Sequence, residues 1–187
     1  MPRAGLSVER LTLAAAELAD EVGFDQVTVS ALARGFGVKD ASLYSHVRNL
    51  GELRTRVAAL ALTELADQVT AAVAGRAGKD ALVAFADTYR GYAHRHPGRY
   101  AAIQLELGPA VAGPATRHSE LTRAVLRGYR LSEPDETDAV RLLGSTFHGY
   151  VSLERAGGFA RTPRAADASW SRTLDALDVL LRNWPIR

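Results

Sequence analysis

The sequence predicts an all-α protein of about nine helices, and three observations support this fold class. Apolar residues recur at helical spacing in nearly every segment, glycine and proline separate the segments, and no stretch has the alternation of a convincing strand. With 187 residues, 47% of them hydrophobic, the chain can bury a sizeable core. We expect a small N-terminal helical module followed by a larger helical body.

The first helix is predicted from Ser7 to about Val22. Ser7 is a suitable N-cap, and Gly23 is a suitable C-cap. Phe24 and Val27 are expected to anchor the link to the next helix. One face of the first helix is marked by apolar residues three or four positions apart, which are Val8, Leu11, Ala15, Leu18 and Val22.

Residues 28–47 predict two short helices joined by a sharp turn. Thr28 caps a helix that runs to about Arg34, residues 35–37 break it, and the next helix runs from about Asp40 to His46. A sharp turn of this kind needs a small residue, a positive φ and an apolar residue, and the sequence offers Ala33, Gly37 and Leu43. This spacing is typical of a DNA-binding helix-turn-helix, although an ordinary corner between two helices can share it.

The rest of the chain also has helical periodicity. A long helix is predicted from about residue 50 to 74, and residues 108–114 and 157–163 are predicted loops. The remaining helices are expected over residues 80–96, 100–107, 120–131, 135–156 and 166–183. We therefore expect a helix-turn-helix domain over residues 1–57, a linking helix over 50–74, and a helical body over 58–187.

Charge is informative only where it is concentrated. The net charge of +2 says little about partners, but residues 29–57 carry five cationic side chains against Asp40 and Glu52. The second short helix presents polar and aromatic side chains suited to a major groove, which are Ser42, Tyr44, Ser45 and His46. Double-stranded DNA is therefore the partner expected for this module.

Residues 7–57 resemble the N-terminal domain of the tetracycline-repressor-like (TetR/AcrR) family of bacterial transcription regulators. The resemblance rests on Gly23-Phe24, Val27-Thr28-Val29, Leu32-Ala33, Gly37-Val38, Ser42-Leu43-Tyr44 and His46-Val47. It implies a dimer that binds operator DNA through Thr28, Ser30, Lys39, Ser42, Tyr44, Ser45, His46 and Arg48. The sequence departs from the family pattern at Ser30, at Lys39-Asp40 and at Leu50, where relatives often carry other residues at the DNA.

A second resemblance covers part of the helical body. His148-Gly149, Leu153-Glu154 and Gly157-Gly158-Phe159 are similar to the signature of the WHG subfamily of C-terminal domains, although its tryptophan is missing. That resemblance implies a dimerising, ligand-binding domain with an unknown small-molecule effector. Effector contacts are expected from aromatic and polar residues that could also be plain core, namely Phe85, Tyr89, Tyr92, Tyr100, Gln104, Phe147, His148 and Tyr150.

The last helix carries an apolar seam with a large ring at each end. Its members are Trp170, Leu174, Leu177, Leu181 and Trp184. On pattern alone this stripe fits either an ordinary core or a partner helix. The family resemblance favours the partner, because in that family the last two helices form a four-helix dimer interface.

Several other functions have little support in the sequence. The absence of cysteine excludes disulfides, zinc–thiolate sites and cysteine nucleophiles. His94 and His96 lie on different helix faces, and Ser152 with His148 lacks a nucleophile-elbow pattern. We expect no enzyme activity, metal or cofactor.

The expected cellular setting is the cytoplasm. No apolar run reaches the roughly 18–20 residues of a membrane span, and the first residues lack the apolar stretch of a signal peptide. The sequence predicts a ligand-responsive repressor that binds a palindromic operator as a homodimer. The alternative is a dimeric ligand-binding or protein-interaction module that has lost specific DNA binding.

Overall fold

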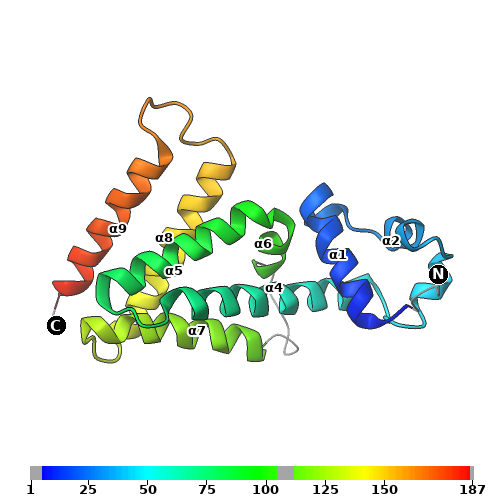
Figure 1. Cartoon of the computed structure of the whole chain (residues 1–187), viewed down its shortest axis with the longest axis horizontal. Coiled ribbons are helices and arrows are strands. Elements are labelled where there is room, and N and C mark those ends of the chain that lie inside the picture. The colour runs from blue at the N-terminus through cyan, green and yellow to red at the C-terminus, as the bar shows by residue number, and fades with distance from the viewer. Residues whose placement is uncertain (1–5, 105–111, 186–187) are drawn as a thin grey trace. The chain divides into compact units, whose positions relative to one another are not determined.

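The computed structural model describes residues 6–104 and 112–185, and within these ranges the chain is helical and contains no strand. The all-α prediction is confirmed (Figure 1). The helices are α1 (Val8–Val22), α2 (Val29–Phe36), α3 (Asp40–Leu43), α4 (Leu50–Val73), α5 (Gly78–Arg95), α6 (Pro97–Ile103), α7 (Ala112–Leu126), α8 (Asp135–Arg155) and α9 (Ala166–Arg182). No helix in these ranges is both long and apolar enough to cross a membrane.

The chain divides into two compact units that do not follow the sequence order. Unit 1 contains residues 1–64 and 95–116, and unit 2 contains residues 65–94 and 117–187. Helix α4 contributes residues to both units. The expected domain boundary at residues 57/58 therefore stays a prediction.

Local signals predicted the first helices well. Ser7 Oγ accepts a hydrogen bond from the Arg10 N–H at 3.3 Å, and Thr28 Oγ1 accepts one from the Ala31 N–H at 3.2 Å. Gly37 ends α2 with a φ of +67°, the left-handed conformation expected of the sharp turn. Helix α2 extends to Phe36, slightly further than predicted.

Several helix boundaries differ from the predictions. Helix α7 begins at Ala112, although residues 112–114 were expected to belong to a loop over 108–114; residues 108–111 of that loop lie outside the described residues. Pro114 lies in its first turn, where a helix tolerates proline because no intrahelical partner exists for that N–H. Helix α3 ends at Leu43, so the expected helical residues up to His46 form a turn instead. The predicted helix over 100–107 is observed as α6, from Pro97 to Ile103, and residues 105–107 lie outside the described residues.

Unit 1 has one hydrophobic core that joins α1, α2, α3, the start of α4 and α6. Ala33 and Leu43 are buried in it, as the turn geometry requires, and Ala102 of α6 completes it. Asp20 of α1 caps α6, because its Oδ1 accepts hydrogen bonds from the Gly98 and Arg99 N–H groups at 2.9 Å each. Unit 1 is therefore held together by a contact between segments about 80 residues apart.

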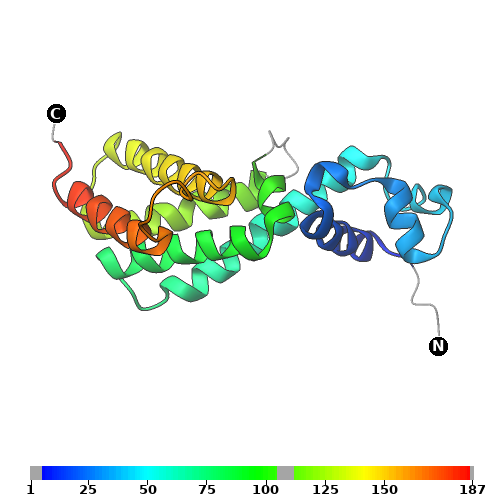
Figure 2. The same cartoon turned by 90° about the horizontal axis from the view of Figure 1, so that it is seen from above.

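Unit 2 is a helical bundle in which α8 and α9 lie side by side and antiparallel (Figures 1 and 2). Its core is aromatic at the centre. The Phe147 ring lies 6.1 Å from Phe85, 6.0 Å from Tyr89 and 5.8 Å from Trp170, measured between centroids. These rings join α5, α8 and α9.

Candidate functional site

The predicted DNA-binding residues surround the turn between α2 and α3. Tyr44 directly follows α3, and its side chain is 52% exposed, which is unusual for so large a ring. The others range from half-buried to exposed, namely Thr28, Ser30, Lys39, Ser42, Ser45, His46 and Arg48. The buried residues of the turn, Ala33 and Leu43, hold the backbone that carries these side chains.

Ser30 and Asp40 form one feature that the sequence did not predict. The Ser30 hydroxyl donates a hydrogen bond to Asp40 Oδ2 at 2.5 Å, which joins the first turn of α2 to the first residue of α3. Both residues depart from the family pattern, and the structure pairs them with each other. The pair keeps the Asp40 carboxylate at the N-terminus of α3, where the helix dipole favours a negative charge.

The cationic side chains of this segment differ in whether they already bind groups of the same chain. Arg54 donates to the Asp25 carbonyl at 3.0 Å and lies over the Phe24 ring at 5.5 Å. Among the described residues, no carboxylate forms an ion pair with Arg34 or Lys39. Arg34 and Lys39 are therefore available to an anionic partner such as a phosphate backbone.

Glu52 organises the start of α4. The Arg48 backbone N–H donates to Glu52 Oε2 at 2.8 Å, and the Arg56 guanidinium donates to Oε1 at 2.9 Å. Asn49 Oδ1 accepts from the Glu52 N–H at 2.8 Å, so the two side chains cap the helix much as a capping box does. These donors, the Arg48 N–H first and then the Arg56 and Arg48 side chains, lower the pKa of Glu52 from 4.5 to about 2.

The lowered pKa predicts a pH dependence of stability. Because the ionised carboxylate is favoured in the folded chain, its contribution is present above the ordinary pKa and is lost as the pH falls from about 5 to about 2. We expect Glu52→Gln to lower the free energy of unfolding at pH 7 and to have a smaller effect at pH 3. Urea unfolding at both pH values checks this, and an equal difference at the two would contradict it.

A small cavity lies in unit 2 between α5, α7 and α8. Its volume is about 90 Å³, and its walls include Phe85, Tyr89 and Phe147, three of the residues predicted to contact an effector. His118 of α7 lines it too, with its ring 5.6 Å from Phe85 and 6.2 Å from Tyr89. No charged side chain lines this cavity.

The other predicted effector residues lie elsewhere. Tyr92 is fully buried in α5, and Tyr150 donates a hydrogen bond to the Ala166 carbonyl at 2.6 Å. His148 is half-buried on α8. Tyr100 is buried and Gln104 is exposed, and both belong to unit 1. The structure thus brings together only the three aromatic residues of the cavity.

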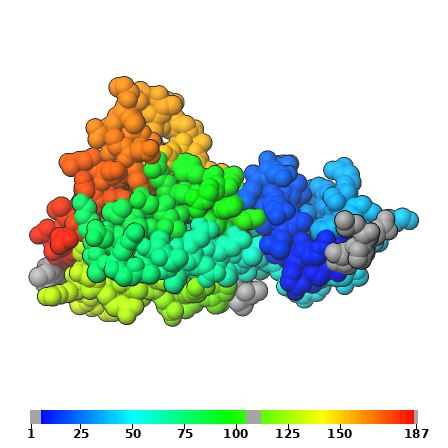
Figure 3. Space-filling view, viewed as in Figure 1, coloured from blue at the N-terminus to red at the C-terminus, as the bar shows by residue number. Residues whose placement is uncertain are grey.

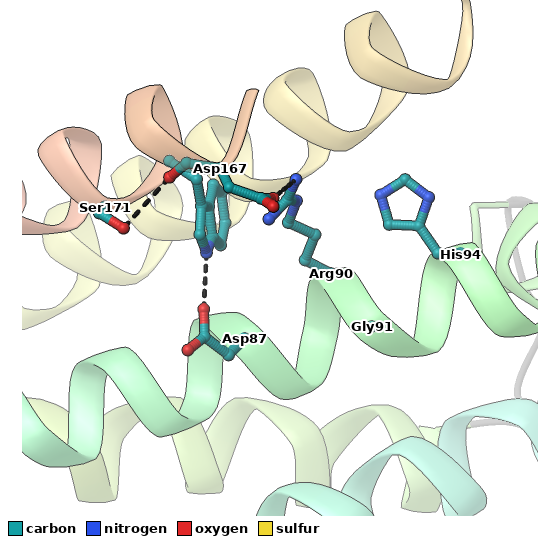
Figure 4. Close-up of a pocket in the computed structure, with 7 residues that line it drawn as sticks. Asp87, Arg90, Gly91, His94, Asp167 and Ser171 are labelled. Atoms are coloured by element: carbon teal, nitrogen blue, oxygen red, sulfur yellow. Dashed lines mark hydrogen bonds and ion pairs between the residues drawn. The ribbon is translucent and has the colours of Figure 1, made fainter. Parts of the chain in front are cut away.

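A larger groove of about 460 Å³ lies between α5 and the start of α9 (Figure 4). Arg90 donates hydrogen bonds to Glu154 and, at 2.7 Å, to Asp167, and Figure 4 shows its side chain reaching toward Asp167. His94 Nε2 lies 2.9 Å from Glu154 Oε2, and Trp170 donates to Asp87 at 2.6 Å.

These contacts bear on whether the groove could bind a ligand. The hydrogen bond to Glu154 raises the pKa of Arg90, and the same contact lowers the pKa of Glu154. A ligand would have to replace hydrogen bonds that the wall already makes to itself. The polar contacts at this groove thus join α5 to α8 and α9.

The seam of α9 lies in the core of unit 2. Trp170, Leu174, Leu177 and Leu181 are at most 6% exposed, and Trp184 is half-buried. The first four side chains are thus covered within the single chain, whereas part of Trp184 remains accessible. That this seam meets a partner helix stays a prediction. The large apolar side chains of α8 and α9 that are exposed are Leu153, Val179 and Leu180. Figure 3 shows the α8–α9 hairpin in yellow to red.

The side chains of the enzyme-like patterns contact other residues of the chain. His96 Nδ1 lies 3.1 Å from Asp20 Oδ2 in unit 1, whereas His94 belongs to unit 2. His148 Nε2 lies 3.4 Å from the Ser152 hydroxyl, but Glu154 contacts Arg90 and His94. Across the described ranges no group of three or more potential metal ligands comes together.

Sequence reasoning missed His118 and Asp20. His118 stands four residues before Thr122 and seven before Val125, both buried, so the periodicity of α7 could have identified it as an inward-facing residue. No local signal identifies Asp20, because its partners at residues 96–99 are far along the chain.

Comparisons with known proteins agree with this geometry. Residues 11–53 match the model of bacterial regulatory proteins of the tetR family, and residues 82–177 match the model of the tetracyclin repressor-like C-terminal domain. The second match includes the stretch from His148 to Phe159.

Individual relatives extend over most of the chain. The HTH-type transcriptional regulator Rv0681 of Mycobacterium tuberculosis is 36% identical over 162 residues, 82% of this chain and 72% of the relative. The HTH-type regulator YobS of Bacillus subtilis is 32% identical over 86% of this chain and 85% of the relative. The TetR family protein ActR of Streptomyces coelicolor, solved with (S)-DNPA, shares the fold with a TM-score of 0.73, 20% identity, and coverage of 97% of this chain and 100% of ActR. On these matches, the chain belongs to the tetR family of bacterial regulatory proteins.

Proposed function

We propose that this DNA-binding transcriptional regulator is a cytoplasmic, ligand-responsive repressor that binds a palindromic operator as a homodimer. The observation that carries the proposal is the turn at Gly37, which fixes α2 against α3 over buried Leu43 and leaves Tyr44 exposed. Family membership and this intact turn favour DNA binding over a module that has lost it.

DNA reading requires two copies of the chain. One short reading helix makes few base contacts, whereas two can read half-sites about one helical turn, or ~34 Å, apart. The expected contacts come from Thr28, Ser30, Lys39, Ser42, Tyr44, Ser45, His46 and Arg48. A duplex with inverted-repeat symmetry is therefore the proposed target.

The outer face of the α8–α9 hairpin is proposed as the dimer surface. Leu153, Val179 and Leu180 are all at least 40% exposed in the single chain. Apolar side chains of this size on neighbouring helices are typical of a surface that a second helix pair covers. The apolar seam of α9 is separate from these exposed side chains, since Trp170 and Leu181 are buried in the single chain.

A charge on this surface should separate the subunits. We expect Val179→Asp to shift the protein to monomer at micromolar concentration, because its side chain is 59% exposed and the substitution leaves the core intact. Sedimentation measures the mass. Leu13→Asp is the matched control, since Leu13 is an exposed apolar residue of α1 in unit 1, and it should leave the mass unchanged. Equal masses for wild type and Val179→Asp would contradict the assignment.

Effector binding is proposed to change the fit of the dimer to DNA. Helix α4 is proposed as the lever, and it is one of three helices, with α5 and α7, that carry residues of both units. A coupling free energy of about 1–3 kcal/mol would weaken operator binding roughly 5–150-fold, which is sufficient for a switch. Phe85, Tyr89 and Phe147 around the cavity of unit 2 are the proposed effector contacts.

Selection from random duplexes tests the proposed function. The expected result is enrichment of one inverted repeat, which then binds in gel-shift assays at low and moderate salt, as should the promoter region upstream of the protein's own gene. The affinity should fall with salt because phosphate contacts contribute to it. Failure to enrich any sequence would overturn the proposal.

A further inference from the structure

Resting on the proposed function, we infer that the effector is a compact, uncharged and largely apolar molecule whose single hydroxyl group hydrogen-bonds to His118. The inference concerns the cavity between α5, α7 and α8. It rests on three observations: the size of the cavity, the absence of charge in its walls, and a buried nitrogen without a partner on His118, one of the residues that line it.

The size of the cavity limits the effector. At about 90 Å³ it is smaller than the roughly 150 Å³ of an engineered cavity that binds benzene, and far smaller than typical sites for drug-sized ligands. Aromatic rings and aliphatic side chains form most of the wall, including Phe85, Phe147 and Leu143. A single ring or a short branched chain fits with little adjustment, whereas a polycyclic molecule would require the helices to separate.

The wall chemistry excludes a charged effector. Every side chain that lines the cavity is uncharged when His118 is neutral. Burial lowers the pKa of His118 below its ordinary value, which favours the neutral imidazole. An ion would lose its hydration without gaining a counter-charge, and a neutral molecule avoids that cost.

His118 supplies the specific contact. Its Nδ1 is buried and has no hydrogen-bond partner in the part of the chain that the structure describes. Two serine or threonine hydroxyls also line the cavity. The Thr122 hydroxyl donates to the His118 carbonyl at 3.1 Å, and Ser119 is solvent-exposed. A buried nitrogen without a partner is costly, and a ligand that satisfies it gains in affinity.

The tautomer of His118 does not change the ligand class. A neutral imidazole has one donor nitrogen and one acceptor nitrogen, so Nδ1 either accepts or donates. A hydroxyl group can do both, which matches either tautomer. A hydrocarbon of the same shape leaves Nδ1 unsatisfied, so the site should discriminate between the two molecules.

Phenol, toluene and benzoate are matched probes for calorimetric titration of the full-length protein. Phenol is expected to bind at least about tenfold more tightly than toluene, because only phenol satisfies the imidazole, and benzoate should not bind. Equal affinities for phenol and toluene, tight binding of benzoate, or no binding of phenol at millimolar concentration would each overturn the inference.

Two variants assign the preference to His118. His118→Phe keeps an aromatic ring but removes both nitrogens, so toluene should bind at least as tightly as phenol. His118→Gln keeps a hydrogen-bonding group and should still prefer phenol; circular dichroism confirms that each variant is folded. A preference for phenol that persists in His118→Phe would overturn the assignment. Because these titrations contain no DNA, their failure is separate from failure of the operator selection.

Discussion

Replacing Gly98 by alanine should strongly destabilise the protein. A Cβ atom at this position would lie 2.0 Å from the Ala19 carbonyl oxygen and 2.6 Å from the Asp20 nitrogen. Both are backbone atoms of α1, so no side-chain rotation can relieve the overlap. Helix α6 would have to move away from α1, which breaks the hydrogen bonds from Asp20 to the Gly98 and Arg99 N–H groups. We expect a loss of about 3 kcal/mol or more.

Urea unfolding followed by circular dichroism measures this loss. Gly35→Ala is the matched control, because a Cβ atom at Gly35 in α2 would meet nothing within 4 Å. Alanine is favoured over glycine inside a helix by roughly 0.5–1 kcal/mol, so the control should be neutral or slightly more stable. Similar stabilities for the two variants would show that α6 does not pack on α1 as described.

Helix termini and the sharp turn were predictable because their determinants are local. Ser7 and Thr28 accept hydrogen bonds from residues only three positions further along the chain. Residue 37 is a glycine, the residue type that most readily adopts the positive φ of the turn. The contact of Asp20 with α6 was not predictable in this way. It joins residues about 80 positions apart, and the sequence carries no local sign of it.

The apolar seam of α9 shows a different limit. Its spacing correctly identifies Trp170, Leu174, Leu177 and Leu181 as one buried face. Periodicity describes which side of a helix avoids water, but it does not say whether the same chain or another chain covers that side. In the structure, the chain's own α5 and α8 contribute the covering, with the Tyr150 and Phe147 rings 4.8 and 5.8 Å from Trp170.

The sequence could indicate which residue types contact an effector, but not which individual residues line the cavity. Aromatic residues mark both cavities and plain cores, so the predicted set includes three cavity residues and also Tyr100 and Gln104 in the other unit. The distinguishing residue is His118, whose role depends on an unpaired buried nitrogen. That property arises from packing and is visible only once the helices are placed.

Replacing Tyr44 by alanine should weaken operator binding by about 30-fold or more. Tyr44 is the most exposed large ring beside the turn, and a base or phosphate contact is worth about 1–3 kcal/mol, counted twice in a dimer. Fold stability should change little, because the exposed side chain contributes little to the core. Gel-shift titration on the selected operator measures the affinity. Tyr44→Phe keeps the ring and removes the hydroxyl, so it distinguishes the contributions of the two groups to binding.

Replacing Asp40, beside the same turn, should change operator affinity in the opposite direction. Its carboxylate accepts from the Ser30 hydroxyl and places a negative charge at the N-terminal end of α3, among the residues proposed to contact DNA. Asp40→Asn keeps a hydrogen-bonding oxygen for Ser30 and removes the charge, so operator affinity should rise, most clearly at low salt where electrostatic effects are least screened. A surface that binds DNA responds in opposite directions to Tyr44→Ala and Asp40→Asn. If both variants bind the operator as wild type does, then the reading surface lies elsewhere on the chain, because a general loss of folding could not leave both affinities unchanged.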